Sequence, residues 1–132
     1  MTVFLGTVGL LAVWDKSDQW HEAAEAASLR MAAAHADVVT TTFVLLECGN
    51  AAARRAYRAA VGRLRQHLEQ GGWLIVPAVA DWREAWTAYE CGEAGSAGIV
   101  DHVSFVVMRR LGISTAFTND QHFRAAGFEL LF

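Results

Sequence analysis

The sequence predicts a single α/β domain, a three-layer sandwich in which helices flank a central parallel sheet. Short runs rich in β-branched and aromatic residues recur along the chain, separated by longer stretches of helical composition. Of the 132 residues, 54% are hydrophobic and 19% are charged, which is enough apolar material for a large core. Parallel strands joined by right-handed helical crossovers place helices on both faces of an open sheet.

Five buried strands are expected, each a short apolar or β-rich run. They are Val3–Leu5, Val38–Thr41, Trp73–Val76, Thr115–Thr118 and Phe128–Leu131. Pro77, the only proline, closes the third run. Helices are predicted between them over residues 18–34, 43–70, 80–92 and 99–111. No repeat or linker interrupts the pattern, so residues 1–132 are expected to form one domain.

Composition also excludes several classes of protein. The apolar stretches are shorter than the roughly 20 residues of a membrane span, and the N-terminus lacks the features of a signal peptide, so a cytoplasmic protein is expected. Cys48 and Cys91 lie far apart without a metal-binding motif and are predicted to be free core thiols. The net charge of −3 gives no general attraction to nucleic acid, which would require a local basic patch.

Three acidic residues are expected at one edge of the sheet. Glu47 lies early in the helix after the second strand, Asp101 near the start of the helix over 99–111, and Asp120 just after the fourth strand. Ligands of parallel α/β sheets bind at this carboxyl edge. Taken singly, Glu47 could be a solvated acid, Asp101 a partner of the helix dipole and Asp120 a helix cap. Together they favour a Mg²⁺ or Mn²⁺ site, because clustered carboxylates repel one another without a cation.

Four motifs in this order resemble the PIN domain family, in particular the VapC ribonuclease toxins that are paired with VapB antitoxins. The motifs are Val3–Ala12, Thr40–Glu47, Ile99–Phe105 with Met108–Ile113, and Thr118–Phe123 followed by Gly127–Phe128. The resemblance covers essentially the whole chain. It implies a PIN-like fold and a metal-dependent endoribonuclease whose four acidic residues hold Mg²⁺ or Mn²⁺.

The same resemblance implies a role for individual residues. Glu47, Asp101 and Asp120 match three of the family's four acids and are the expected catalytic and metal-binding residues. Thr118 and Asn119 are expected to support Asp120. The implied partners are an RNA substrate, a VapB-like antitoxin and a second copy of the chain. In such pairs the antitoxin's C-terminal segment fills a hydrophobic groove and places a basic side chain among the acids.

The family's first acidic position falls on Gly6, which supplies no side-chain ligand. The neighbouring Thr7 hydroxyl is expected to serve only as support. Gly6 has three explanations: natural loss in a degenerate toxin, a change selected because active toxin harms its host, or a site that works with water in the gap. We therefore expect RNA cleavage to be weakened or absent.

Three other features have competing interpretations. The arginines in the predicted helix over 43–70 could guide RNA or form a solvated face; they are Arg54, Arg55, Arg58, Arg63 and Arg65. His122 could contact phosphate or pack locally at the start of its helix. Trp14 and Trp20 flank the charged turn at residues 15–18 and could be core residues or part of a groove.

Two rival functions remain. The first is a non-catalytic PIN-like module that binds an antitoxin or RNA. The second is a phosphatase-like α/β domain, which requires a nucleophilic aspartate after the first strand where this chain has Gly6.

Overall fold

The fold is built on a five-stranded parallel sheet in a computed structural model that describes residues 1–132. The strands are β1 (Thr2–Leu5), β2 (Asp37–Thr41), β3 (Leu74–Ile75), β4 (Thr115–Phe117) and β5 (Glu129–Leu130). They pair in the order β3-β2-β1-β4-β5, and every pair is parallel. The predicted central sheet is confirmed, with strand ends that differ from the prediction by one residue at most.

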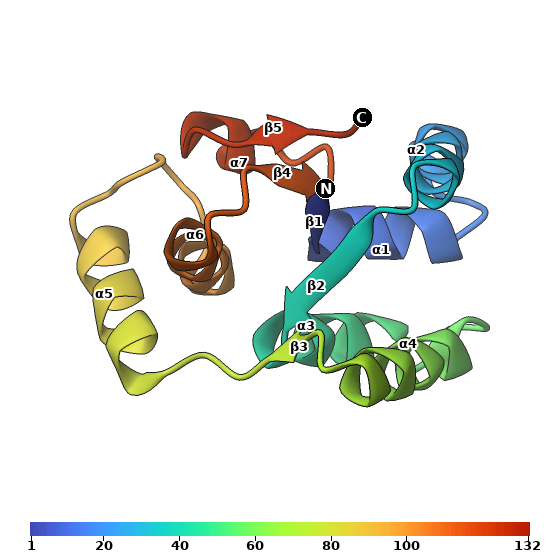
Figure 1. Cartoon of the computed structure of the whole chain (residues 1–132), viewed down its shortest axis with the longest axis horizontal. Helices are drawn as coiled ribbons and strands as arrows, with labels where there is room; N and C mark the ends of the chain where they lie inside the picture. The colour runs from blue at the N-terminus through green and yellow to red at the C-terminus, as the bar shows by residue number, and fades with distance from the viewer.

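Seven helices connect and cover the strands. They are α1 (Thr7–Trp14), α2 (His21–Ala33), α3 (Thr42–Ala52), α4 (Arg58–Gly71), α5 (Val79–Glu90), α6 (Ile99–Leu111) and α7 (Gln121–Ala125). Figure 1 shows α1 and α2 on one side of β1 and α5 and α6 on the other, as right-handed crossovers in this strand order require. The three-layer sandwich is therefore confirmed. None of the helices combines the length and apolar composition needed to cross a lipid bilayer.

One predicted helix is wrong, and one helix was not predicted. Residues 43–70 form two helices, α3 and α4, separated by a turn at residues 53–57. Tertiary contacts hold this turn: the ring of Tyr57 stacks on Trp14 with centroids 6.4 Å apart, and Arg55 pairs with Asp15 at 2.7 Å. Helix α1 was not predicted because residues 7–14 are almost uniformly apolar and show no helical period.

The core lies between the central strand and the helices packed on it. Val3 and Phe4 of β1 are fully buried, and α6 is buried continuously over residues 102–108. Cys48 is buried and free, as predicted. Cys91 is exposed because it follows the last residue of α5 in a surface turn, so the prediction of a core thiol is wrong there.

The start of α1 lies against the end of β4. The backbone N–H of Gly6 donates to the carbonyl oxygen of Phe117 at 3.3 Å. One turn later, a Cβ added to Gly9 would lie only 2.1 Å from the same oxygen. Only glycine permits this approach of helix and strand backbones, and the approach places Thr7 beside the residues that follow β4.

Gly9→Ala should lower the free energy of unfolding by about 3 kcal/mol or more, because the backbone of β4 cannot move aside for the added methyl group. Gly62→Ala in α4 is the matched control, since its Cβ would meet no atom within 4 Å. It should stabilise the chain by about 0.5–1 kcal/mol through helix propensity. Urea unfolding of both variants checks this. Equal stabilities would show that α1 is not held against β4.

Candidate metal centre

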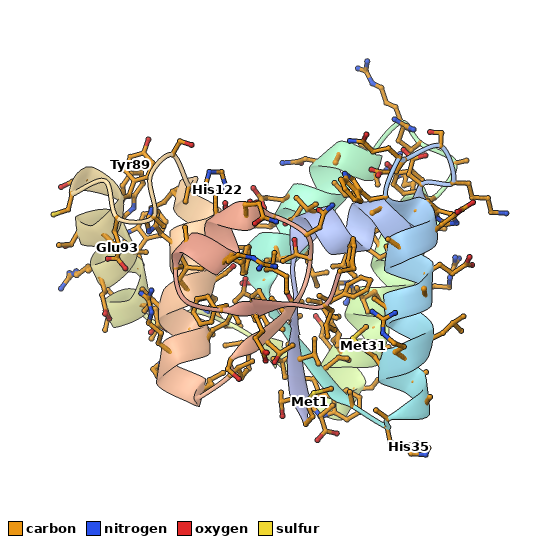
Figure 2. All side chains as sticks on the ribbon, turned by 90° about the horizontal axis from the view of Figure 1, so that it is seen from above. Met1, Met31, His35, Tyr89, Glu93 and His122 are labelled. Atoms are coloured by element: carbon orange, nitrogen blue, oxygen red, sulfur yellow. The ribbon has the colours of Figure 1, made fainter.

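The candidate site lies at the carboxyl edge of the sheet, where β1, β2 and β4 end. Figure 2 places His122, which follows β4, near this edge, and Met1 and His35, which precede β1 and β2, at the opposite end. The strand order reverses between β1 and β4, and such switch points are where open α/β sheets bind their ligands.

Asp120 is held by the turn that leads from β4 into α7. Its Oδ1 accepts a hydrogen bond from the backbone N–H of His122 at 2.9 Å, so the expected helix cap is present. The fully buried Thr118 accepts a hydrogen bond from the backbone N–H of Asp120 at 3.1 Å. Asn119 is partly buried, and its backbone carbonyl accepts a bond from Gln121 at 3.3 Å. These contacts leave Asp120 Oδ2 without a hydrogen bond within the chain.

Asp101 lies in the first turn of α6, as predicted, and its side chain is half-buried. Burial, together with the negative charges of Asp120 and Glu47, raises the pKa of Asp101 to about 6. A backbone hydrogen bond from Gly98 and the proximity of His122 oppose the shift. A half-buried carboxylate beside two other acids favours a bound cation.

Glu47 enters the site from α3 and is partly buried, as expected. Its Oε1 accepts a hydrogen bond of 2.6 Å from the hydroxyl of Thr7, the first residue of α1. The hydroxyl of Thr7 therefore orients the carboxylate of Glu47. Glu47 lies close enough to raise the pKa of Asp101 but outside the tightest group of potential ligands.

That tightest group consists of Asp101, Asp120 and His122. Each offers one ligand atom, and the three atoms all lie within 4.8 Å of one another. His122 Nδ1 lies 2.9 Å from Asp120 Oδ1, and its Nε2 lies 3.1 Å from the hydroxyl oxygen of Ser96. These oxygen and nitrogen donors can hold a divalent cation. No sequence pattern pointed to Ser96 as part of this group. For His122 the available signal was its place two residues after the capping Asp120.

Gly6 is buried at the N-terminal cap of α1. Its φ of −90° and ψ of 156° are open to any residue, so the backbone does not require glycine here. A Cβ added at Gly6 would lie 3.2 Å from the Cβ of Thr118. A side chain at this position therefore needs a shift of a few tenths of an ångström in a buried neighbour.

Two cavities lie outside the acidic cluster. One of about 480 Å³ is lined by the end of α1 and by the turn between α3 and α4; its residues are Trp14, Asp15, Lys16, Ser17, Arg55, Ala56 and Tyr57. Trp14 thus contributes to a groove, whereas Trp20 is exposed outside it. The other, of about 350 Å³, lies between α3 and α4.

The five arginines of α4 and of the turn before it are all exposed. Two of them are already paired with acids, Arg55 with Asp15 at 2.7 Å and Arg65 with Glu69 at 2.8 Å. Arg54, Arg58 and Arg63 form no ion pair, although Arg58 donates a hydrogen bond to the carbonyl oxygen of Ala53 at 3.2 Å. The basic face is therefore weaker than the arginine count implies.

Comparison with protein families matches residues 10–129 to the PIN domain. The chain belongs to the PIN domain family. The match includes the positions of Glu47, Asp101 and Asp120, whereas Gly6 lies outside the matched residues. No curated protein matches the chain.

Several solved structures share this PIN fold. VapC20 of Mycobacterium tuberculosis, described as a sarcin-ricin loop cleaving toxin, is 27% identical with a TM-score of 0.76, and the match covers 96% of this chain and 95% of that one. FitAcB of Neisseria gonorrhoeae is 18% identical over 98% and 96% of the two chains, with a TM-score of 0.60. VapBC2 of Rickettsia felis, bound to a DNA fragment from its promoter, is 15% identical over 98% and 97%, with a TM-score of 0.64.

Asp101→Asn should stabilise this PIN domain at pH 7 in the absence of metal by about 1–2 kcal/mol, discounted for the solvent that reaches the side chain. The folded-state pKa is raised from 3.8 to about 6, so the folded chain binds more protons than the unfolded chain in this window. Asp101 therefore lowers the free energy of unfolding by an amount that grows as the pH rises from about 4 to about 6. Above pH 6 this destabilisation has reached its full size.

Urea unfolding in EDTA at pH 4 and pH 7 measures this effect. The stabilisation should be much smaller at pH 4. Asp37→Asn, at the exposed start of β2, is the matched control and should show no such pH dependence. A stabilisation by Asp101→Asn that is equal at both pH values would contradict the charge repulsion described above.

Proposed function

We propose that this PIN domain is a metal-dependent endoribonuclease of the VapC toxin type, with an activity weakened at Gly6. The observation that carries the proposal is the convergence of Asp101, Asp120 and Glu47 at the carboxyl edge of a PIN fold. The most similar of the solved structures described above is a toxin that cleaves the sarcin-ricin loop, and the others include antitoxin complexes, which supports both RNA as substrate and a toxin-antitoxin role.

Each acid has a defined task in this proposal. Asp101 and Asp120 bind the cation, because their oxygens lie in the group of closest donors. Glu47 comes from α3, is oriented by the Thr7 hydroxyl, and adds a third negative charge beside Asp101 and Asp120. Thr118 fixes the turn that carries Asp120. A bound Mg²⁺ or Mn²⁺ supplies Lewis-acid polarisation of the phosphodiester and lowers the pKa of water.

RNA reaches the site past a surface with limited positive charge. Arg54, Arg58 and Arg63 are the arginines there without an ion pair, and they are the groups available to contact phosphates. The chain carries a net charge of −3, so binding to RNA depends on this local patch and on the cation.

Restoring an acid at the first position is the direct test of the activity. Gly6→Asp should convert weak or absent cleavage into Mg²⁺-dependent cleavage, because a fourth carboxylate increases the affinity of the site for a hard cation. The measurement is cleavage of a mixed RNA substrate with and without EDTA, and the expected gain is about tenfold or more.

Gly6→Ala is the matched control, since it introduces the same Cβ beside Thr118 without the carboxylate. The double variant Gly6→Asp with Asp101→Asn should be inactive. Robust EDTA-sensitive cleavage by the unaltered chain would show that Gly6 is tolerated. Absence of cleavage by a folded, metal-binding Gly6→Asp variant would favour the non-catalytic alternative.

An antitoxin is the proposed partner, and the groove between α3 and α4 is the proposed seat of its apolar segment. The groove is lined by Leu45, Leu46, Val61 and Leu74. A basic side chain from the same segment would compensate the acids when no metal is bound.

A homodimer is also proposed on the family resemblance, and the exposed Val76, Val79 and Trp82 supply apolar surface for it.

Leu46→Asp should abolish stable capture of the antitoxin, with at least a tenfold loss of affinity, because a charge in an apolar groove is costly to desolvate. Leu46 is 66% exposed, so the substitution leaves the core intact. Leu111→Asp, at the far end of α6 from Asp101, is the control and should retain binding. Co-purification of each variant with a co-expressed VapB-like antitoxin measures both. Failure of the unaltered chain to co-purify at low salt would count against the toxin assignment.

Gly6 favours a second function, a non-catalytic module that binds an antitoxin or RNA. Gly6 itself supplies no carboxylate, and the atoms nearest to a Cβ placed there belong to Thr118 and Phe117, neither of which is acidic. This alternative predicts antitoxin or RNA binding that survives EDTA, together with no cleavage by Gly6→Asp.

A further inference from the structure

The His122 ring is held at both of its nitrogens. Nδ1 faces Asp120 Oδ1 at 2.9 Å, and Nε2 faces the Ser96 hydroxyl oxygen at 3.1 Å. Ser96 belongs to the segment before α6, so two distant parts of the chain fix the orientation of the ring. The orientation keeps Nδ1 directed toward the acids and leaves Nε2 on the outer side.

The position of the ring proton decides what Nδ1 can do. With the proton on Nδ1, His122 donates to Asp120 and Ser96 donates to Nε2. With the proton on Nε2, His122 donates to Ser96, and Nδ1 presents an electron pair next to the electron pairs of Asp120. The second arrangement requires a cation between them. It also matches the usual habit of metal-binding histidines, whose other ring nitrogen donates to a nearby oxygen.

The donors around this point are therefore mixed. Asp101 and Asp120 supply oxygen and His122 supplies nitrogen within one group of atoms no more than 4.8 Å apart, while Gly6 supplies nothing. Mg²⁺ is a hard ion that selects oxygen ligands. Imidazole nitrogen binds the first-row transition ions better, and Mn²⁺ accepts carboxylates as well.

We propose that His122 is a direct nitrogen ligand at this centre, and that the centre binds Mn²⁺ and later first-row ions in preference to Mg²⁺. The inference rests on the part of the proposed function that places a divalent cation here, and not on RNA cleavage. Ser96 acts as a positioning residue that keeps the proton on Nε2.

Pulsed EPR of the Mn²⁺-loaded chain tests the nitrogen ligand directly. The unaltered chain should show ¹⁴N coupling to Mn²⁺, and His122→Asn should lose it. Titration should show that His122→Asn weakens Mn²⁺ binding about tenfold or more and changes Mg²⁺ binding much less. His122 is partly exposed, so thermal unfolding of the variant should remain close to that of the unaltered chain.

His35→Asn is the matched control. His35 lies at the opposite end of the molecule (Figure 2), and its φ of 51° is one that asparagine tolerates well. This variant should keep both the ¹⁴N coupling and the preference for Mn²⁺.

Two results would overturn the inference. One is Mn²⁺ bound without ¹⁴N coupling, and the other is an equal loss of Mg²⁺ and Mn²⁺ affinity in His122→Asn. Either could occur together with EDTA-sensitive RNA cleavage by Gly6→Asp, in which case the nuclease proposal stands and only the role of His122 fails. If neither ion binds the unaltered chain, this inference fails; metal-dependent cleavage by Gly6→Asp then decides the nuclease proposal by itself.

Discussion

The close approach of α1 to the end of β4 is the constraint on which the candidate site depends. Gly9 lets the helix backbone reach the Phe117 carbonyl, and the N–H of Gly6 bonds to the same oxygen. This contact sets Gly6 next to Thr118, which leads into the turn that carries Asp120, and the hydroxyl of the following Thr7 holds Glu47 from α3. Elements that are more than thirty residues apart in the chain thus deliver their side chains to one edge. Backbone packing brings the elements together, and side-chain hydrogen bonds of Thr7, Thr118 and Asp120 set the local geometry.

The acids work against the stability of the fold that holds them. Asp101 is half-buried beside two other carboxylates, and its raised pKa records the cost of keeping it charged there. Other contacts offset this loss of folding free energy. Helix α6 is buried over seven successive residues, and Thr118 and the α7 cap hold Asp120 in place. Charged groups destabilised in this way are common at functional sites, because a ligand of opposite charge relieves the repulsion and so binds more tightly.

Gly6 and His122 are the two residues that bear most on the proposed chemistry of this edge. The first acidic position has no side chain, and Thr118 limits the room for one. The remaining donors include an imidazole whose two nitrogens are both engaged. The strand order therefore explains why the candidate site lies at this edge. The individual donor atoms would determine which cation it prefers and how tightly that cation binds.

The sequence alone determined the sheet, the order of its elements and the edge at which Glu47, Asp101 and Asp120 meet, because hydrophobic periodicity reports burial and parallel strands share one carboxyl edge. It missed α1, whose uniformly apolar residues carry no period, and it missed the break between α3 and α4. Only the tertiary structure decided the break, the Thr7–Glu47 bond, the Ser96–His122 contact and the narrow space at Gly6. Each of these depends on side chains from separate elements meeting in space, and local sequence pattern does not encode such distances.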